Sequence, residues 1–307
     1  KKIDIEYTDI YKRKNDILIT QKNKNKFYIE GENFNLSNII DQVLFSDTNT
    51  SEVFDDNERN FKISFKKNLI DDDHYILNLL GTFNMKGDDI YDLSLNSSFP
   101  NEDNLSMSIK TKNTEKITTF YSEQAKPFVK KYKFVKGFEG GKIDFYSVKQ
   151  NNVTKSQLKI FDFSLKELPA LTKILTLASL QGIADLLSGE GVGFDELEMS
   201  FTNKKNLMEI DELYSIGPAI SILMEGYIKK DELVSLRGTL VPATTINKFV
   251  GSIPVLGDIL VGKKTGEGVF GVSFKLKGPP KNIKTSVNPI KTLTPRFITR
   301  TLEKIKK

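Results

Sequence analysis

Apolar and polar residues alternate along most of the chain. Residues 91–96 read Tyr-Asp-Leu-Ser-Leu-Asn and residues 105–110 read Leu-Ser-Met-Ser-Ile-Lys, separated by a segment rich in Asn and acidic residues. A period of two places apolar side chains on one face of an extended segment, so this pattern predicts half-buried antiparallel strands joined by a turn. The same pattern predicts strands over residues 3–10, 26–30, 61–67, 75–85, 142–149, 157–165, 194–203, 206–214, 219–228, 232–241 and 268–277.

These strands predict a mainly β fold built on one long antiparallel sheet. About a dozen strands at a spacing of roughly 4.8 Å would make a sheet on the order of 55 Å wide, and sheets of that size curl or close. A weak repeat, residues 80–90 and 225–233, indicates a β-meander unit that is used more than once. We expect residues 1–124 to hold meander repeats with one helix and residues 125–307 to form a C-terminal module in the same sheet.

A few segments break the alternation and predict short amphipathic helices. Residues 36–45 have helical apolar spacing, and residues 169–187 begin with a proline in the first turn and end before Ser188-Gly189. Residues 244–261 are interrupted by a glycine and a proline, which predicts two short helices, and another short helix is expected after Pro295.

Composition excludes several classes of catalytic site. The 307 residues include no Cys and one His, so disulfides, thiol nucleophiles and thiolate-bound metals are excluded, and a His-based metal site or Ser-His-Asp triad is disfavoured. The net charge is +5, but residues 281–307 hold eight Lys or Arg and one acid, which leaves 37 bases and 39 acids before them. Basicity is therefore concentrated in the tail, and we expect no nucleic-acid footprint over the body.

Four near-matches to chemical motifs each fail on spacing or context. Residues 257–263 fit the first seven positions of a P-loop, but Lys264 stands where Ser or Thr must bind magnesium, and the stretch precedes a strand. The glycines of residues 189–193 follow a helix, the reverse of the dinucleotide-binding order. Ser64-Phe65-Lys66-Lys67 matches one sequence element of penicillin-binding enzymes, but it lies in a predicted strand and the middle element of that motif set is absent. Residues 71–74 read Asp-Asp-Asp-His and favour an acidic turn over a metal site. We expect no enzyme activity and no cofactor or metal.

The C-terminal half carries a specific series of strings in one order. It includes residues 169–194 (Pro-Ala-Leu through Gly-Val-Gly-Phe), Gly217-Pro218-Ala219, 225–228, 236–243, 253–257, 266–270, Gly278-Pro279-Pro280 and Val287-Asn288-Pro289. This series resembles the C-terminal region of AsmA-like proteins of the YhdP type.

The resemblance implies a cellular location and a function for the protein. It implies a periplasmic protein of double-membraned bacteria, anchored in the inner membrane by an N-terminal helix that precedes Lys1, which itself begins in the middle of a strand pattern. It further implies an elongated β-sheet groove with an apolar lining that binds phospholipid acyl chains and moves phospholipids towards the outer membrane. No apolar run of about twenty residues is present to span a bilayer.

The alternation assigns one set of apolar residues to the face that such a groove would use. The same alternation also builds the closed core of a β-sandwich, which would suit a scaffold or assembly factor for outer-membrane proteins. The candidate lipid-binding residues are Phe83, Met85, Leu93, Leu95, Met107, Ile109, Leu197, Met199, Phe201, Met208, Ile210, Ile220, Ile222, Met224, Leu236, Leu240, Phe270, Val272 and Phe274.

Two C-terminal segments are candidates for contact with a membrane surface. The first segment has more apolar residues than a single helix face can bury, and it could instead pack under the end of the sheet. The second segment mixes basic and apolar residues, and it could instead form a solvated cap over the last strand. Their candidate residues are Phe249, Val250, Ile253, Val255, Leu256, Ile259 and Leu260 in the first, and Arg296, Phe297, Arg300 and Lys304 in the second.

Overall fold

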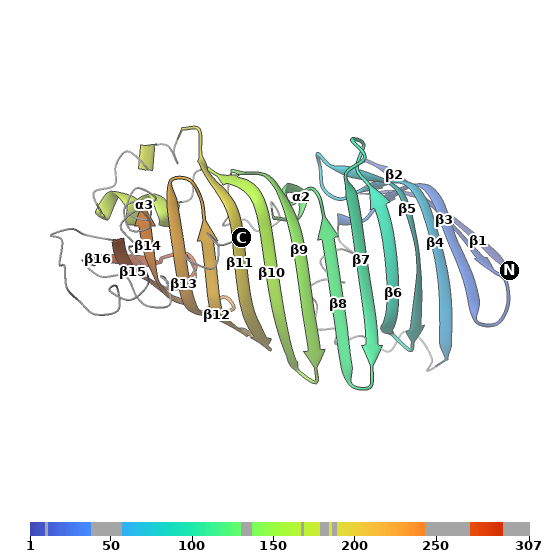
Figure 1. Ribbon diagram of the computed structural model, residues 1–307. Helices are drawn as coiled ribbons and strands as arrows, with labels where there is room; N and C mark the ends of the chain where they lie inside the picture. Colours follow the sequence, from blue (N-terminus) through green and yellow to red (C-terminus); the bar gives the residue numbers. More distant parts are fainter. Residues whose placement is uncertain are drawn as a thin grey trace, which may run out of the picture. The chain divides into compact units, whose positions relative to one another are not determined.

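The structure is a computed structural model of the chain (Figure 1). It describes residues 1–9, 12–37, 57–129, 137–166, 169–178, 184–185, 189–242 and 271–290. Its strands are β1 Lys2–Thr8, β2 Lys14–Gln21, β3 Lys26–Asn35, β4 Glu58–Leu69, β5 Tyr75–Lys86, β6 Asp89–Ser98, β7 Asn104–Lys112, β8 Glu115–Ser122, β9 Phe138–Gln150, β10 Val153–Leu165, β11 Val192–Lys204, β12 Leu207–Ile216, β13 Ile220–Lys229, β14 Leu233–Pro242, β15 Gly271–Gly278 and β16 Lys284–Ile290; its helices are α2 Lys126–Val129 and α3 Pro169–Leu177.

The described strands form one open sheet of sixteen strands, in which each strand pairs with its neighbours in sequence order from β1 to β16. The expected fold class, mainly β with one long open sheet and short helices, is confirmed. One pair departs from the mostly antiparallel arrangement: β3 and β4 are parallel, with Lys26 beside Asn60 and Asn35 beside Leu69. A parallel pair requires that the connection between the two strands return to the end of the sheet at which the first strand began.

The chain divides into two compact units, each of which we describe by itself. The first unit comprises Lys1–Phe128 and Lys142–Thr154, and the second comprises Val129–Gly141 and Lys155–Lys307. The first unit thus holds β1–β8 and most of β9, and the second holds β11–β16 and most of β10.

Tight turns join many of the strands because their central residues adopt positive φ. Asn113 (φ 57°), Asn151 (φ 54°) and Lys205 (φ 50°) each occupy the first position of a two-residue connection, after β7, β9 and β11. Two-residue hairpins require the left-handed region, which asparagine adopts more readily than most residues. These turns place the flanking strands in direct antiparallel register.

Two short helices pack through apolar side chains. In α2 of the first unit, the ring of Phe128 meets the ring of Phe120 edge-on, with centroids 4.7 Å apart. In the second unit, α3 begins at Pro169, as predicted, buries Leu171, Ile174 and Leu175, and contacts β16. The predicted helices at 36–45, at 244–261 and after Pro295 lie almost wholly outside the described residues.

A glycine in β14 makes room for an aromatic ring of the next strand. Gly238 lies beside Phe274 of β15, and a Cβ atom on Gly238 would fall 2.6 Å from Cζ of Phe274 and against the carbonyl oxygen of Leu223. Such separations are shorter than van der Waals contact. Phe274 can therefore cover this part of the sheet only because residue 238 has no side chain.

We predict that Gly238→Ala destabilises the protein by about 1–3 kcal/mol, because the Phe274 ring and the neighbouring backbone must shift. Gly193→Ala is the matched control: a Cβ atom there would meet no atom within 4 Å. Urea unfolding of the two variants checks the prediction, and equal stabilities would contradict it.

Candidate functional site

In the first unit, strand register gathers apolar residues into continuous cross-strand rows on one face. Residues that lie directly opposite each other on neighbouring strands project to the same face of a sheet. One row crosses eight strands through Ile19, Ile29, Ile63, Gly81, Leu95, Met107, Phe120 and Phe145. The next row contains Phe27, Phe61, Phe83, Leu93 and Ile109.

Aromatic stacking reinforces the second of these rows. The ring centroids of Phe27 and Phe61 are 5.1 Å apart, and those of Phe61 and Phe83 are 4.4 Å apart, in both cases with nearly parallel planes. Stacked aromatic pairs of this kind add about 0.5–1.5 kcal/mol beyond the area that they bury. They lock three neighbouring strands in the register that keeps the face apolar.

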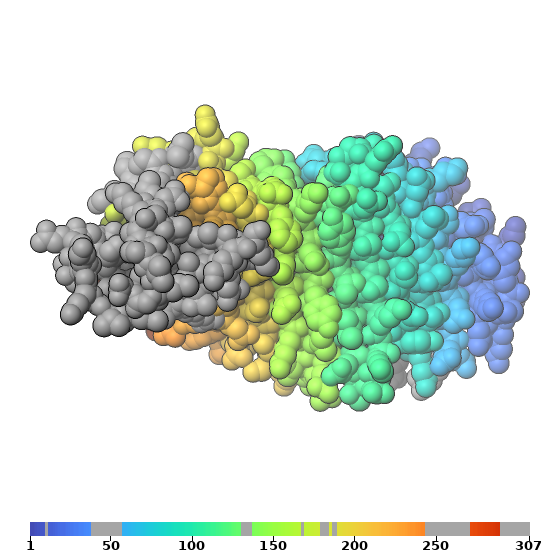
Figure 2. Space-filling model, in the orientation of Figure 1, coloured from blue at the N-terminus to red at the C-terminus, as the bar shows by residue number. Residues whose placement is uncertain are grey.

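The opposite face of the first unit is polar. Its central row runs through Tyr28, Lys62, Thr82, Ser94, Ser108, Thr119 and Tyr146. Because α2 packs on Phe120 of the apolar face and is drawn behind the strands in Figure 1, the polar face is turned to the viewer. In Figure 2, side chains cover this face over β5–β8 and leave no hollow.

The second unit repeats the arrangement on β11–β16. Three neighbouring rows lie on one face: Leu197, Ser215, Ile222, Leu240 and Val272; Met199, Leu213, Met224, Gly238 and Phe274; and Phe201, Ile210, Gly226, Leu236 and Leu276. The opposite face carries the charges, among them Glu225, whose carboxylate lies 2.7 Å from the guanidinium of Arg237.

The predicted lipid-binding residues are placed on these apolar faces, but their exposure differs. In the first unit Met85, Leu93, Met107 and Ile109 are buried, and in the second unit so are Phe201, Ile210, Ile220, Leu240, Val272 and Phe274. The half-buried residues are Phe83, Leu95, Leu197, Met199, Met208, Ile222, Met224 and Leu236. Phe270 lies outside the described residues.

Most of the half-buried apolar residues form one contiguous patch in each unit, and Leu95 of β6 borders the patch of the first unit across Gly81. In the first unit this patch, the β2–β5 patch, consists of Ile19, Ile29, Phe27, Ile63, Phe61 and Phe83. In the second unit the β11–β13 patch consists of Leu197, Met199, Leu213, Ile222 and Met224. Among the described residues of the two apolar faces, the side chains of these two patches are partly exposed to solvent.

Sequence reasoning missed several residues of these faces. Phe27, Phe61 and Leu213 lie in predicted strands, and their alternation with polar neighbours was the signal that identifies them. Phe120 and Phe145 complete the first row, and Phe120 belongs to β8, which the pattern did not predict. The candidates for membrane contact, from Phe249 to Leu260 and from Arg296 to Lys304, lie outside the described residues.

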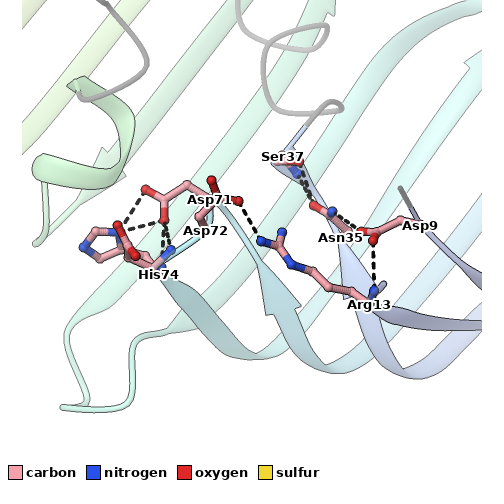
Figure 3. A network of polar contacts seen from close by, with 8 residues as sticks. Asp9, Arg13, Asn35, Ser37, Asp71, Asp72 and His74 are labelled. Atoms are coloured by element: carbon pink, nitrogen blue, oxygen red, sulfur yellow. Dashed lines mark hydrogen bonds and ion pairs between the residues drawn. The ribbon is translucent and has the colours of Figure 1, made fainter. Parts of the chain in front are cut away.

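A network of polar contacts connects turns and strand ends at one end of the first unit (Figure 3). Arg13 Nη2 lies 2.6 Å from Asp72 Oδ1, and the backbone N–H of Arg13 donates to Asp9. Asn35 donates to Asp9 from its side-chain amide. The network ties the β1–β2 turn to the end of β3 and to the β4–β5 turn.

The acidic turn at residues 71–74 is part of the same network. Asp71 Oδ1 accepts hydrogen bonds from the backbone N–H groups of Asp73 and His74, and His74 Nδ1 lies 2.9 Å from both carboxylate oxygens of Asp71. These contacts hold the turn closed. Within the described ranges, no three His, Cys, Asp or Glu side chains gather as ligands for a metal ion.

Hydrogen bonds to two carboxylates join further strand ends of the first unit. Asp103 accepts from the amides of Gln124 and Asn101, and these bonds hold the pKa of its carboxyl below the ordinary value. Glu123 accepts from the backbone N–H of Asn104 at 2.7 Å, which likewise lowers its pKa. Both sets of hydrogen bonds favour the charged form of the carboxylate.

Comparison of the chain with protein-family models, with characterised proteins and with solved structures gave no match. In the part of the chain that the structure describes, no helix combines the length and the apolar character needed to cross a membrane.

We predict that Asp103→Asn lowers the free energy of unfolding at pH 7 but not at acid pH. A carboxyl with a depressed pKa in the folded state stabilises above its unfolded pKa, near 3.9, and loses this contribution as the pH falls through the folded value. Urea unfolding at neutral pH and at about pH 2.5 tests this. Asp231→Asn, in an exposed turn of the second unit, is the control; a deficit in Asp103→Asn that persists at acid pH would contradict the assignment.

Proposed function

We propose that the chain is a non-enzymatic lipid-binding protein whose apolar sheet faces hold phospholipid acyl chains. The observation that carries this proposal is the pair of contiguous, half-buried apolar patches, with most charged side chains of these strands on the opposite face. An acyl chain needs an extended surface without charge, and needs no fixed polar partner along its length. A row of Ile, Leu, Met and Phe side chains supplies that surface.

Hydrophobic contacts on the apolar face can hold an acyl chain and still let it slide. Removal of a methylene group from water is worth about 0.8 kcal/mol, so a sixteen-carbon chain gains roughly 10 kcal/mol when it is fully covered. Contacts of this kind are non-directional, and each methylene finds an equivalent contact one position along. Met199 and Met224 add flexible, polarisable side chains to the β11–β13 patch, which adapt to chains of different shape.

The wider role follows from the resemblance to AsmA-like proteins of the YhdP type. We propose that the chain belongs to a periplasmic protein, anchored in the inner membrane, that moves phospholipids towards the outer membrane. The strings from Pro169 to Pro289 support this, and so does a sheet of strands joined in sequence order, which can extend one apolar face from strand to strand.

A second function, as a scaffold for outer-membrane proteins, is favoured by different observations. Ile220 and Leu240 are completely buried, as in a closed core. The edge strand β1 also exposes Ile3 (56%), Ile5 (38%) and Tyr7 (42%) beside its free edge in the described sheet. An exposed apolar edge strand is a template for adding a strand from another protein.

We predict that the purified protein carries phospholipid and that charge on the apolar face removes it. Native mass spectrometry should detect bound phospholipid in the wild type and at least tenfold less in Leu95→Asp with Ile222→Asp, because each aspartate places an unpaired charge against the acyl chain. The matched control, Ser94→Asp with Tyr227→Asp, puts the same charges on the polar face of the same strands and should keep its lipid. A lipid-free wild type recovered from membrane-containing lysate would contradict the proposal.

A second measurement avoids destabilising substitutions. Because the chain has no Cys, single cysteines report on single positions. We predict that added phospholipid slows the reaction of Ile222→Cys with a water-soluble thiol reagent at least fivefold and leaves Tyr227→Cys unchanged. Equal rates for Ile222→Cys with and without lipid would contradict acyl-chain binding at the β11–β13 patch. Protein partners that are captured equally by wild type and by the Leu95→Asp, Ile222→Asp variant would favour the scaffold.

A further inference from the structure

Antiparallel pairing brings three turns of the second unit to one end of its strands. The β11–β12, β13–β14 and β15–β16 turns alternate with connections at the other end, and all neighbouring strands between them are paired in register. We call residues 204–207, 229–233 and 277–284 the turn end. The three turns are far apart in the sequence but lie at the same end of neighbouring strands.

The turn end is basic. Its three segments contain seven lysines and two acids. Lys204 is paired with Glu209 at 2.9 Å and Lys229 with Glu232 at 2.8 Å. The other five lysines are exposed, and within the described part of the chain none has an ion-pair partner: Lys205, Lys230, Lys277, Lys281 and Lys284.

Apolar side chains are interleaved with these lysines. Leu207 lies in register with both Lys204 and Lys229, and Leu233 lies in register with Lys229. Both leucines are half-buried, and Pro279 and Pro280 are exposed at the β15–β16 turn. The turn end therefore combines exposed lysines with half-buried leucines and exposed prolines.

The two strand ends of the first unit also differ in charge, although the β5–β6 turn adds Asp88 and Asp89 to the end with the β2–β3 turn and the β1–β2 turn adds Lys12, Arg13 and Lys14 to the other. The β2–β3 turn carries Lys22, Lys24 and Lys26. The β4–β5 and β6–β7 turns, at the opposite end of that unit, carry five acids across residues 71–73 and 102–103.

We infer that the turn end of the second unit docks onto a bilayer surface rich in anionic lipid. Lysines near such a surface are attracted to phosphate headgroups, and interleaved apolar residues enter the boundary between headgroups and acyl chains. Single-stranded nucleic acid is a poorer fit, because it is held by aromatic stacking platforms and the turn end contains no aromatic residue. This inference stands apart from acyl-chain binding on the apolar face.

Vesicle flotation tests the inference with the full chain. The probe is vesicles of phosphatidylcholine with about one quarter phosphatidylglycerol, compared with phosphatidylcholine alone. Lys205→Asn, Lys230→Gln and Lys281→Gln are combined, with Asn at position 205 because its φ is positive. Since each lysine near an anionic surface contributes roughly a fivefold factor to binding, we expect a loss of about a hundredfold. Raising the salt concentration should weaken wild-type binding and narrow this gap.

The matched control removes three exposed lysines elsewhere: Lys62→Gln, Lys173→Gln and Lys275→Gln. It should bind within about twofold of the wild type. Three results would each overturn the inference. Both triple variants could lose vesicle binding equally, the turn-end variant could bind vesicles as well as the wild type, or the protein could prefer an oligonucleotide to anionic vesicles. Native mass spectrometry of the turn-end variant separates this result from the proposed function, because its bound phospholipid should be unchanged.

Discussion

Cross-strand register is the constraint on which the rest of the structure depends. Side chains alternate between faces, so a slip of one residue would move Lys62 or Ser94 onto the apolar face and expose its Phe and Leu partners to water. Where the chain departs from a period of two, the register shifts with it. Ile210 and Leu213 are an odd number of residues apart, yet a register irregularity between them keeps both in apolar rows.

The sequence predicted those strands whose alternation is clean and could not predict those held by their neighbours. Residues of β6, β7, β13 and β14 alternate over most of their length, and these strands were predicted closely. The strands β2, β8 and β16 were missed, because their alternation is broken by Asn, Thr or Pro and they are held by pairing with the adjacent strands. The parallel pairing of β3 with β4 was also missed, since side chains alternate between the two faces of a strand whichever direction its neighbour runs.

For the candidate site, the face of each residue could be predicted but its accessibility could not. Ile220 and Ile222 are two residues apart on one strand and share a face, yet the first is completely buried and the second is half-buried. Phe120 is covered because Phe128 of α2 packs on it. Accessibility depends on what lies above the sheet, and a periodic pattern contains no information about a covering segment from elsewhere in the chain.

The net charge can be read from the sequence, but the distribution of charge over the surface depends on how the strands pair. The body of the chain before residue 281 is almost neutral by count, which suggests no preferred surface. Antiparallel pairing then collects every second turn at one end, and in β11–β16 those turns are the lysine-rich ones. A phospholipid is itself divided between an anionic headgroup and an apolar tail. Under the functions proposed above, the apolar face would hold the tail and the basic strand end would meet the headgroup, an arrangement that the average composition does not indicate.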